Sequence, residues 1–135
     1  MRAVLDVNVL VSAAVSPGGT PASIVRRWLF GEFELVVSPN VLAELERALT
    51  YPKLRTRVDS MEADELIDVL RRSALLVGDP AAPRRSADEG DDYLIALAET
   101  QRAVLVSGDK HLLDLAESFP IETPADFLRR LEAQE

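Results

Sequence analysis

Four acidic residues of this 135-residue chain occupy positions from which carboxylate chemistry can be built: Asp6, Glu44, Asp92 and Asp109. Asp6 follows the apolar run AVL and Asp109 follows AVLVSG, and short runs of this kind are typical of buried strands. The carboxyl ends of parallel strands meet at one edge of a sheet. We therefore expect Asp6 and Asp109 to lie near each other, with Glu44 and Asp92 reaching the same edge from helices.

Carboxylates gathered in this way repel one another unless cations lie among them. Hard oxygen ligands suit Mg²⁺ or Mn²⁺. Such ions lower the pKa of a bound water and stabilise charge on a leaving oxygen. The pattern therefore predicts phosphodiester hydrolysis at a metal centre, without a protein nucleophile.

Each acid also has a purely structural interpretation. Asp6 could begin a turn and bond its own backbone, and Glu44 could be a solvated helix residue. Asp92 and Asp109 stand where helices begin, and a carboxylate is favourable there whatever the function. No single position decides between the two interpretations, so the hypothesis depends on all four acids together.

Other chemistries are poorly supported. The chain has no cysteine, which excludes a thiolate zinc site and a cysteine nucleophile, and a lone histidine, His111, cannot supply a zinc site or a catalytic triad. No glycine-rich phosphate loop follows the first strand candidate, where LDVNVLVSA stands instead. Dinucleotide binding is therefore not expected.

The elements that must position these acids alternate along the chain. Strands are expected at residues 3–5, 34–37, 74–77, 103–106 and around Pro120 and Ile121, and the opening MRAVLDVNVLVSAAV reads as a buried strand too short to span a membrane. Helices are expected from Thr20 to about Gly31, after Ser38-Pro39, after Ser60, over DDYLIALAETQ, after Asp109, and over residues 125–131 behind Thr123-Pro124. The segment from Pro80 to Ser86 has loop composition.

This alternation predicts an α/β fold with three layers, α/β/α, around a mostly parallel sheet of about four to five strands. The length and a hydrophobic content of 47% predict one domain over residues 1–135. The absence of cysteine fits a reducing compartment, so a cytoplasmic location is expected.

The net charge of -8 gives no general attraction to nucleic acid, so any such contact must be local. Basic residues could line a groove for phosphates, although most arginines on helices are solvated or paired. The candidates are Arg26, Arg27, Lys53, Arg55, Arg57, Arg84, Arg85 and Lys110.

Four segments in a fixed order carry a resemblance that covers nearly the whole chain: VLDVNVLVSA, SPNVLAELERAL followed by YPKLR, DDYLIALA, and VLVSGDKHLL. Together they resemble the PIN-domain family of nucleases. The closer resemblance is to the small stand-alone bacterial PIN proteins described as toxins of toxin-antitoxin pairs.

The resemblance implies that Asp6, Glu44, Asp92 and Asp109 bind Mg²⁺ or Mn²⁺ and are the catalytic residues, with Asn8 and Ser107 as polar supports and Asp91 as an auxiliary ligand. Asp92 is preferred to Asp91 because it directly precedes YLIALA. The resemblance also implies an RNA substrate, a homodimer, and a small antitoxin protein that blocks the activity.

Two alternatives remain open from the sequence. An aspartate after the first strand is also where phosphatases like the haloacid dehalogenases keep their nucleophile, but Asn8 stands where they use a second aspartate as acid and base. The other alternative is a non-catalytic RNA-binding or assembly module with the same fold. A phosphatase assay on a simple ester separates the first from a nuclease.

Overall fold

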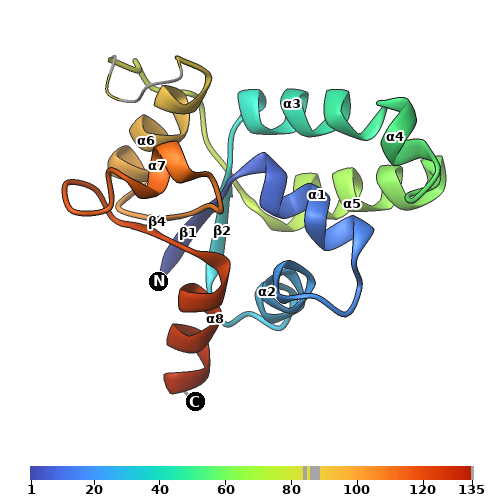
Figure 1. Ribbon diagram of the computed structural model, residues 1–135, viewed down its shortest axis with the longest axis horizontal. Helices are drawn as coiled ribbons and strands as arrows, with labels where there is room; N and C mark the ends of the chain where they lie inside the picture. The colour runs from blue at the N-terminus through green and yellow to red at the C-terminus, as the bar shows by residue number, and fades with distance from the viewer. Residues whose placement is uncertain (84, 86–88, 135) are drawn as a thin grey trace.

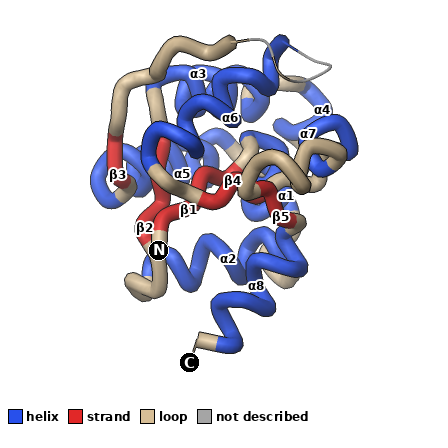
Figure 2. Tube along the Cα trace, turned by 90° about the vertical axis from the view of Figure 1, so that its left-hand side faces the viewer, coloured by secondary structure: helices blue, strands red, loops and turns tan. Residues whose placement is uncertain are grey.

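A five-stranded sheet forms the centre of the computed structural model, which describes residues 1–83, 85 and 89–134. The strands are β1 (Arg2–Leu5), β2 (Glu34–Val37), β3 (Leu75–Leu76), β4 (Val104–Val106) and β5 (Ile121–Glu122). Every pairing is parallel and the order is β3-β2-β1-β4-β5, which Figure 2 shows from one edge of the sheet to the other. The expected α/β sheet is confirmed, with β3 shorter than residues 74–77.

Helices cover both faces of this sheet. They are α1 (Val7–Val15), α2 (Thr20–Leu29), α3 (Pro39–Leu49), α4 (Pro52–Arg55), α5 (Ser60–Ser73), α6 (Glu89–Gln101), α7 (Lys110–Leu113) and α8 (Pro124–Ala133). Figure 1 shows α6 and α7 on one side of the strands and α1, α2, α3 and α5 on the other. The three layers arise because right-handed crossovers between parallel strands place helices on both faces of the sheet.

The strand order reverses once. From β1 the chain adds β2 and then β3 on one side, and it then returns across the sheet through α6 to β4 and β5 on the other side. Crossovers of one hand that run in opposite directions place their helices on opposite faces. The order reverses between β1 and β4, and in open sheets of this type ligands bind outside the carboxyl ends of the strands at such a reversal.

The core lies on both faces of the central strands. Leu5, Leu35 and Leu105 are at most 1% exposed, and Leu94 and Leu97 pack against them from α6. A strand buried on both faces reads as a continuous apolar run, which explains why the central strands were visible in the sequence.

The strand expected over residues 3–5 is confirmed, but the rest of the opening segment is a helix and not part of a buried strand. The strand ends at Leu5 and the chain turns at Asp6 into α1. Asp6 caps this helix, since its Oδ1 accepts the Asn8 N–H at 3.5 Å and its carbonyl accepts the Val9 N–H at 2.8 Å. The β-branched valines of VNVLVSAAV have low helix propensity, so their local signal resembles a strand.

Two expected helix caps are confirmed and two were misplaced by one residue. Ser38 and Thr123 cap α3 and α8 through their hydroxyl oxygens. The cap of α5 is Asp59 rather than Ser60, because the Asp59 carboxylate accepts the Glu62 N–H at 2.8 Å. The cap of α2 is Gly19, and Thr20 is already the first helical residue.

The remaining differences are at element ends. Helix α2 ends at Leu29, and Gly31, with φ of 82°, turns the chain toward β2. In the expected loop from Pro80 to Ser86, Arg84 and Ser86 lie outside the described residues. Across the described ranges, no helix combines the length and the apolar character needed to cross a bilayer.

Candidate active site

Asp6 is buried at the point where β1 meets β4. Asp6 is only 6% exposed, and its backbone N–H donates to the Val106 carbonyl at 2.9 Å. Its Oδ2 accepts the hydroxyl proton of Ser107 at 2.7 Å. The tertiary fold therefore joins the carboxyl ends of the two strands that flank the reversal.

Ser107 and Asp109 continue this hydrogen-bonded chain. The fully buried Ser107 hydroxyl accepts the Asp109 N–H at 3.0 Å. Asp109 is half-buried and its Oδ1 accepts the His111 N–H at 2.9 Å, which caps α7. Asp109 thus has the structural role that its position suggested, and its carboxylate also lies close enough to act electrostatically on Asp6.

Burial raises the pKa of Asp6 above the ordinary value of 3.8. The Ser107 hydroxyl and the Asn8 N–H lower it in part, and the negative charge of Asp109 raises it further. Each of these effects acts on the ionised form, which burial and a like charge disfavour. A bound cation would relieve both penalties.

Glu44 is contributed by a helix and not by the end of a strand. It lies in the middle of α3 and is half-buried beside the apolar residues Val41 and Leu45. Its Oε2 accepts the hydroxyl proton of Tyr93 on α6 at 3.0 Å. This contact links a helix on one face of the sheet with a helix on the other.

Tyr93 is the first residue of the site that the sequence interpretation missed. Burial raises the pKa of its hydroxyl far above the usual range, and the charges of Glu44, Asp6 and Asp79 add to this effect. The hydroxyl therefore stays protonated at neutral pH and donates its hydrogen bond to Glu44. Tyr93 stands next to Asp92 in the segment DDYLIALA, where it reads as one more apolar core residue.

Asp79 is the second residue that was missed. It follows β3 at the same edge of the sheet, and its Oδ2 accepts the Asn40 N–H in the first turn of α3 at 3.0 Å. Its buried Oδ1 has no hydrogen-bond partner among the described residues. Local sequence gave no signal, because Asp79 lies in a Gly-Asp-Pro segment typical of a loop.

Asp92 and Asp91 both belong to the first turns of α6. Asp92 is 4% exposed, and its Oδ1 accepts the Arg85 N–H at 3.0 Å. Asp91 is half-buried. Asp92 is thus the more buried of the two, and both residues have structural contacts. The side chain of Asn8 is exposed and only its backbone contacts Asp6.

The residues of this site fit a divalent cation in donor chemistry but do not form a ready-made cage. Carboxylate oxygens are the ligands that Mg²⁺ and Mn²⁺ prefer, and a buried carboxylate with a raised pKa gains from a nearby cation. Within residues 1–83, 85 and 89–134, however, no three or more Asp, Glu, His or Cys side chains stand in an arrangement that could hold a metal. An ion bound by one or two of these carboxylates would therefore complete its coordination with water.

The basic candidates separate into two groups. Arg26 and Arg27 lie in the last turn of α2, which leads to the amino end of β2, and Arg27 pairs with Glu32 at 3.0 Å. Arg26 and Arg27 therefore lie toward the amino ends of the strands, at the opposite end of the sheet from the acids. Arg85 pairs with Glu99 and lies over the Phe119 ring.

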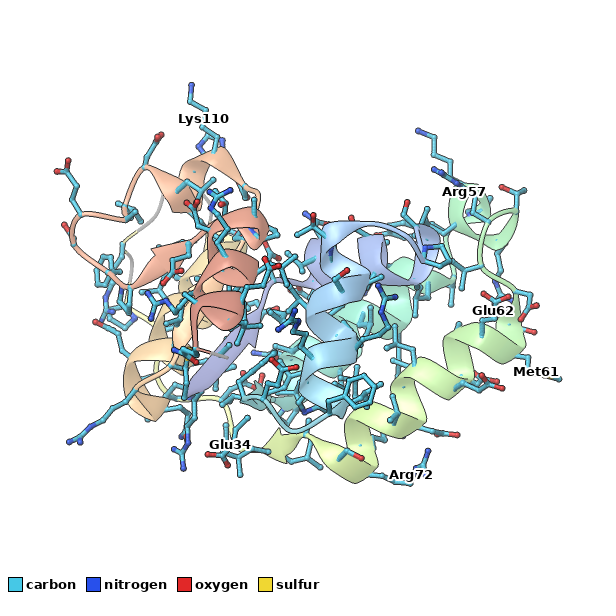
Figure 3. All side chains as sticks on the ribbon, turned by 90° about the horizontal axis from the view of Figure 1, so that it is seen from below. Glu34, Arg57, Met61, Glu62, Arg72 and Lys110 are labelled. Carbon is cyan, nitrogen blue, oxygen red and sulfur yellow. The ribbon has the colours of Figure 1, made fainter. Side chains whose placement is uncertain are left out.

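Lys53, Arg55, Arg57 and Lys110 are exposed, and the Arg57 and Lys110 side chains extend away from the body of the molecule in Figure 3. Arg84 lies outside the described residues.

A family model for the PIN domain matches residues 2–111, a span that contains every acid of the site. The chain belongs to the PIN-domain family. The resemblance read from the four sequence segments is thereby confirmed. Residues 112–135, which include β5 and α8, lie outside the matched span of this PIN-domain chain.

One curated relative is similar over nearly the whole chain. The uncharacterized protein MJ1680 of Methanocaldococcus jannaschii is 23% identical over 143 residues, which cover 98% of this PIN-domain chain and 92% of that protein. The match extends the similarity beyond the span of the family model to nearly the whole of both chains.

Solved structures share the fold at low sequence identity. VapBC2 from Rickettsia felis, in a structure bound to a DNA fragment from its promoter, matches with a TM-score of 0.64 and 15% identity over 91% of this chain and 98% of the other. PAE2754 from Pyrobaculum aerophilum matches with a TM-score of 0.63 and 21% identity over 98% and 90%. VapBC-1 from nontypeable Haemophilus influenzae matches with a TM-score of 0.61 and 16% identity over 93% and 99%. These likenesses show that the chain shares the fold of these proteins.

Proposed function

We propose that this PIN-domain protein is a metal-dependent ribonuclease that hydrolyses RNA phosphodiesters. The observation that carries the proposal is the hydrogen-bonded chain from Asp6 through Ser107 to Asp109 at the sheet reversal. The Asp6 carboxylate and the Asp109 backbone both bond Ser107 at the carboxyl ends of β1 and β4, which is where a ligand of such a sheet is expected to bind. Glu44 and Asp92 supply further carboxylates from the two facing helices.

Asp6, Glu44, Asp92 and Asp109 would hold Mg²⁺ or Mn²⁺, with Asp91 as an auxiliary ligand. The bound ion would supply an activated water and stabilise charge on the leaving oxygen. The protein's own contribution is orientation. Ser107 holds the Asp6 carboxylate by donating to Oδ2, and the backbone of Arg85 holds Asp92 by donating to Oδ1. Outer contacts of this kind fix ligand geometry.

RNA binding must overcome the net charge of -8. Metal ions at this end of the sheet would neutralise the clustered acids, and the exposed Lys53, Arg55, Arg57 and Lys110 can contact phosphates locally. Such contacts position a strand without reading its sequence. We therefore expect affinity to fall steeply with added salt.

The likeness to VapBC structures supports a toxin whose partner is a small antitoxin protein. A homodimer is the expected assembly.

The test is cleavage of a mixed set of labelled RNAs by the purified protein in Mn²⁺, in Mg²⁺ and in EDTA, beside Asp6→Asn prepared identically. A matched control is Asp64→Asn, which removes the charge of an exposed acid on α5. Cleavage should require metal, persist in Asp64→Asn and be lost in Asp6→Asn. Equal cleavage by the protein and Asp6→Asn would contradict the proposed site.

The non-catalytic alternative is favoured by one observation, the lack of a preformed metal-holding cluster in the described part of the chain. It predicts RNA retention in a filter-binding assay with no cleavage in any metal. Hydrolysis of a simple phosphate ester, with intact RNA, would instead support a phosphatase.

A further inference from the structure

Packing in the hydrophobic core explains the ring of Tyr93 but not its hydroxyl. Its ring belongs to the hydrophobic core and the residue is 9% exposed. Its hydroxyl, however, points to Glu44 Oε2 at 3.0 Å, across from α6 to α3. Phenylalanine would fill the same space without the cost of burying a hydroxyl, so the polar group needs a reason in its contact.

The contact restricts a flexible carboxylate. Fixing a free glutamate side chain costs up to about 2 kcal/mol of conformational entropy, and this cost is paid when a ligand is bound unless the side chain is already held. The Tyr93 ring is itself held by core packing, so its hydroxyl is a rigid donor. Hydrogen bonds to an ionised acceptor are among the strong ones.

The position of Tyr93 along α6 adds a second consequence. Asp92 precedes it directly, so a single helix carries one acid of the site and the donor that holds another. Glu44 and Tyr93 are separated by 49 residues and lie on helices that cover opposite faces of the sheet. The bond therefore fixes the Glu44 carboxylate relative to the helix that carries Asp92.

We propose that Tyr93 is a positioning residue that holds the Glu44 carboxylate, through its hydroxyl, in the orientation that binds the divalent cation. This inference rests on the proposed metal-dependent function and adds a residue to it. Tyr93 itself contacts neither the ion nor the RNA.

The first experiment measures Mn²⁺ binding by isothermal titration calorimetry for the unaltered protein and for Tyr93→Phe. The matched control is Tyr51→Phe, which removes a hydroxyl from the only other tyrosine, an exposed residue before α4. Loss of an outer-shell partner typically weakens metal binding by about 10-fold to 100-fold. We expect Tyr93→Phe to bind Mn²⁺ about 10-fold more weakly and Tyr51→Phe to bind it unchanged.

A double-mutant cycle separates positioning from general packing. If Tyr93 acts through Glu44, then Tyr93→Phe should not weaken Mn²⁺ binding further in a Glu44→Ala background. A purely structural role would instead give the same loss in both backgrounds. Circular dichroism melts of all four proteins verify that each is folded during the titration.

The failure of this inference is distinguishable from failure of the proposed function. Equal Mn²⁺ affinity of the unaltered protein and Tyr93→Phe would overturn the role of Tyr93 and leave the metal site standing. Absence of Mn²⁺ binding by the unaltered protein would overturn both. Additive losses in the cycle would also overturn the positioning role.

Discussion

Asp6 shows how one residue can serve the site at the expense of the metal-free fold. It ends β1, caps α1 and accepts the Ser107 hydroxyl, so its structural contacts are extensive. Burial and the charge of Asp109 nevertheless raise its pKa, which means that the ionised form is disfavoured in the folded chain. A carboxylate retained under such conditions is a common sign of function.

The first prediction at the residue scale concerns Asp6→Asn. Because the Asp6 pKa is higher in the folded than in the unfolded chain, the metal-free protein loses stability as the pH rises from 3.8 through the folded value. The loss stays constant above that value and amounts to about 1.4 kcal/mol for each unit of difference. Asp6→Asn removes it, so the variant should unfold at higher urea concentration at neutral pH.

The measurement is urea unfolding of both proteins from pH 3 to pH 8 in EDTA. The advantage of Asp6→Asn should shrink as the pH falls, because both side chains are then neutral. Asp64→Asn on the exposed face of α5 is the control. An advantage that is independent of pH would show that charge is not its cause.

At the element scale, helix N-termini deliver the acids to the sheet edge. Asp6 caps α1, Asp109 caps α7 and Asp79 accepts an N–H in the first turn of α3. A carboxylate near a helix N-terminus is favoured by the unpaired amides and the dipole. These caps fix where each short loop leaves its strand, so local structure and site geometry are set together.

Two substitutions of Asp109 separate its cap from its charge. Asn caps a helix about as well as Asp, whereas Ala at such a position costs about 1 kcal/mol. Asp109→Asn should therefore keep the unfolding free energy within about 0.5 kcal/mol, and Asp109→Ala should lower it by about 1 kcal/mol. Both should lose RNA cleavage, as followed on the labelled substrates. Full cleavage by Asp109→Asn would remove Asp109 from the catalytic set.

At the scale of the whole molecule, the reversal of strand order brings Asp6 and Asp109 from distant parts of the chain to the same end of the sheet. Ser107 and Asp6 are 101 residues apart in sequence and 2.7 Å apart between their side-chain oxygens. A cation bound there would join β1, β4, α3 and α6. Its binding energy would then contribute to the stability of the entire fold.

The corresponding prediction is a metal-dependent melting temperature. A ligand present at 100 times its dissociation constant stabilises the folded state by about 2.7 kcal/mol, so millimolar Mn²⁺ should raise the midpoint of thermal unfolding by several degrees. EDTA should reverse the shift, and Asp6→Asn should reduce it. Differential scanning fluorimetry provides the measurement. An unchanged midpoint at millimolar Mn²⁺ would count against a metal centre.

The sequence by itself determined the features that depend on neighbouring residues. Apolar runs predicted the parallel strands, and Ser38-Pro39 and Thr123-Pro124 predicted two helix starts, because strands and caps have local signatures. The placement of Asp6 and Asp109 at one sheet edge also followed, since parallel strands impose it.

Only the tertiary structure decided the contacts between distant segments. Helix α1 was not predicted, because its β-branched valines are typical of a strand. Arg26 and Arg27 lie toward the amino ends of the strands, away from the acids. Tyr93 and Asp79 lie near the acids although their sequence neighbours gave no signal of it. Each depends on packing across the sheet. A hydroxyl in an apolar helix segment becomes a donor to Glu44 only when the fold brings α6 and α3 together, and no pattern of neighbouring residues encodes that distance.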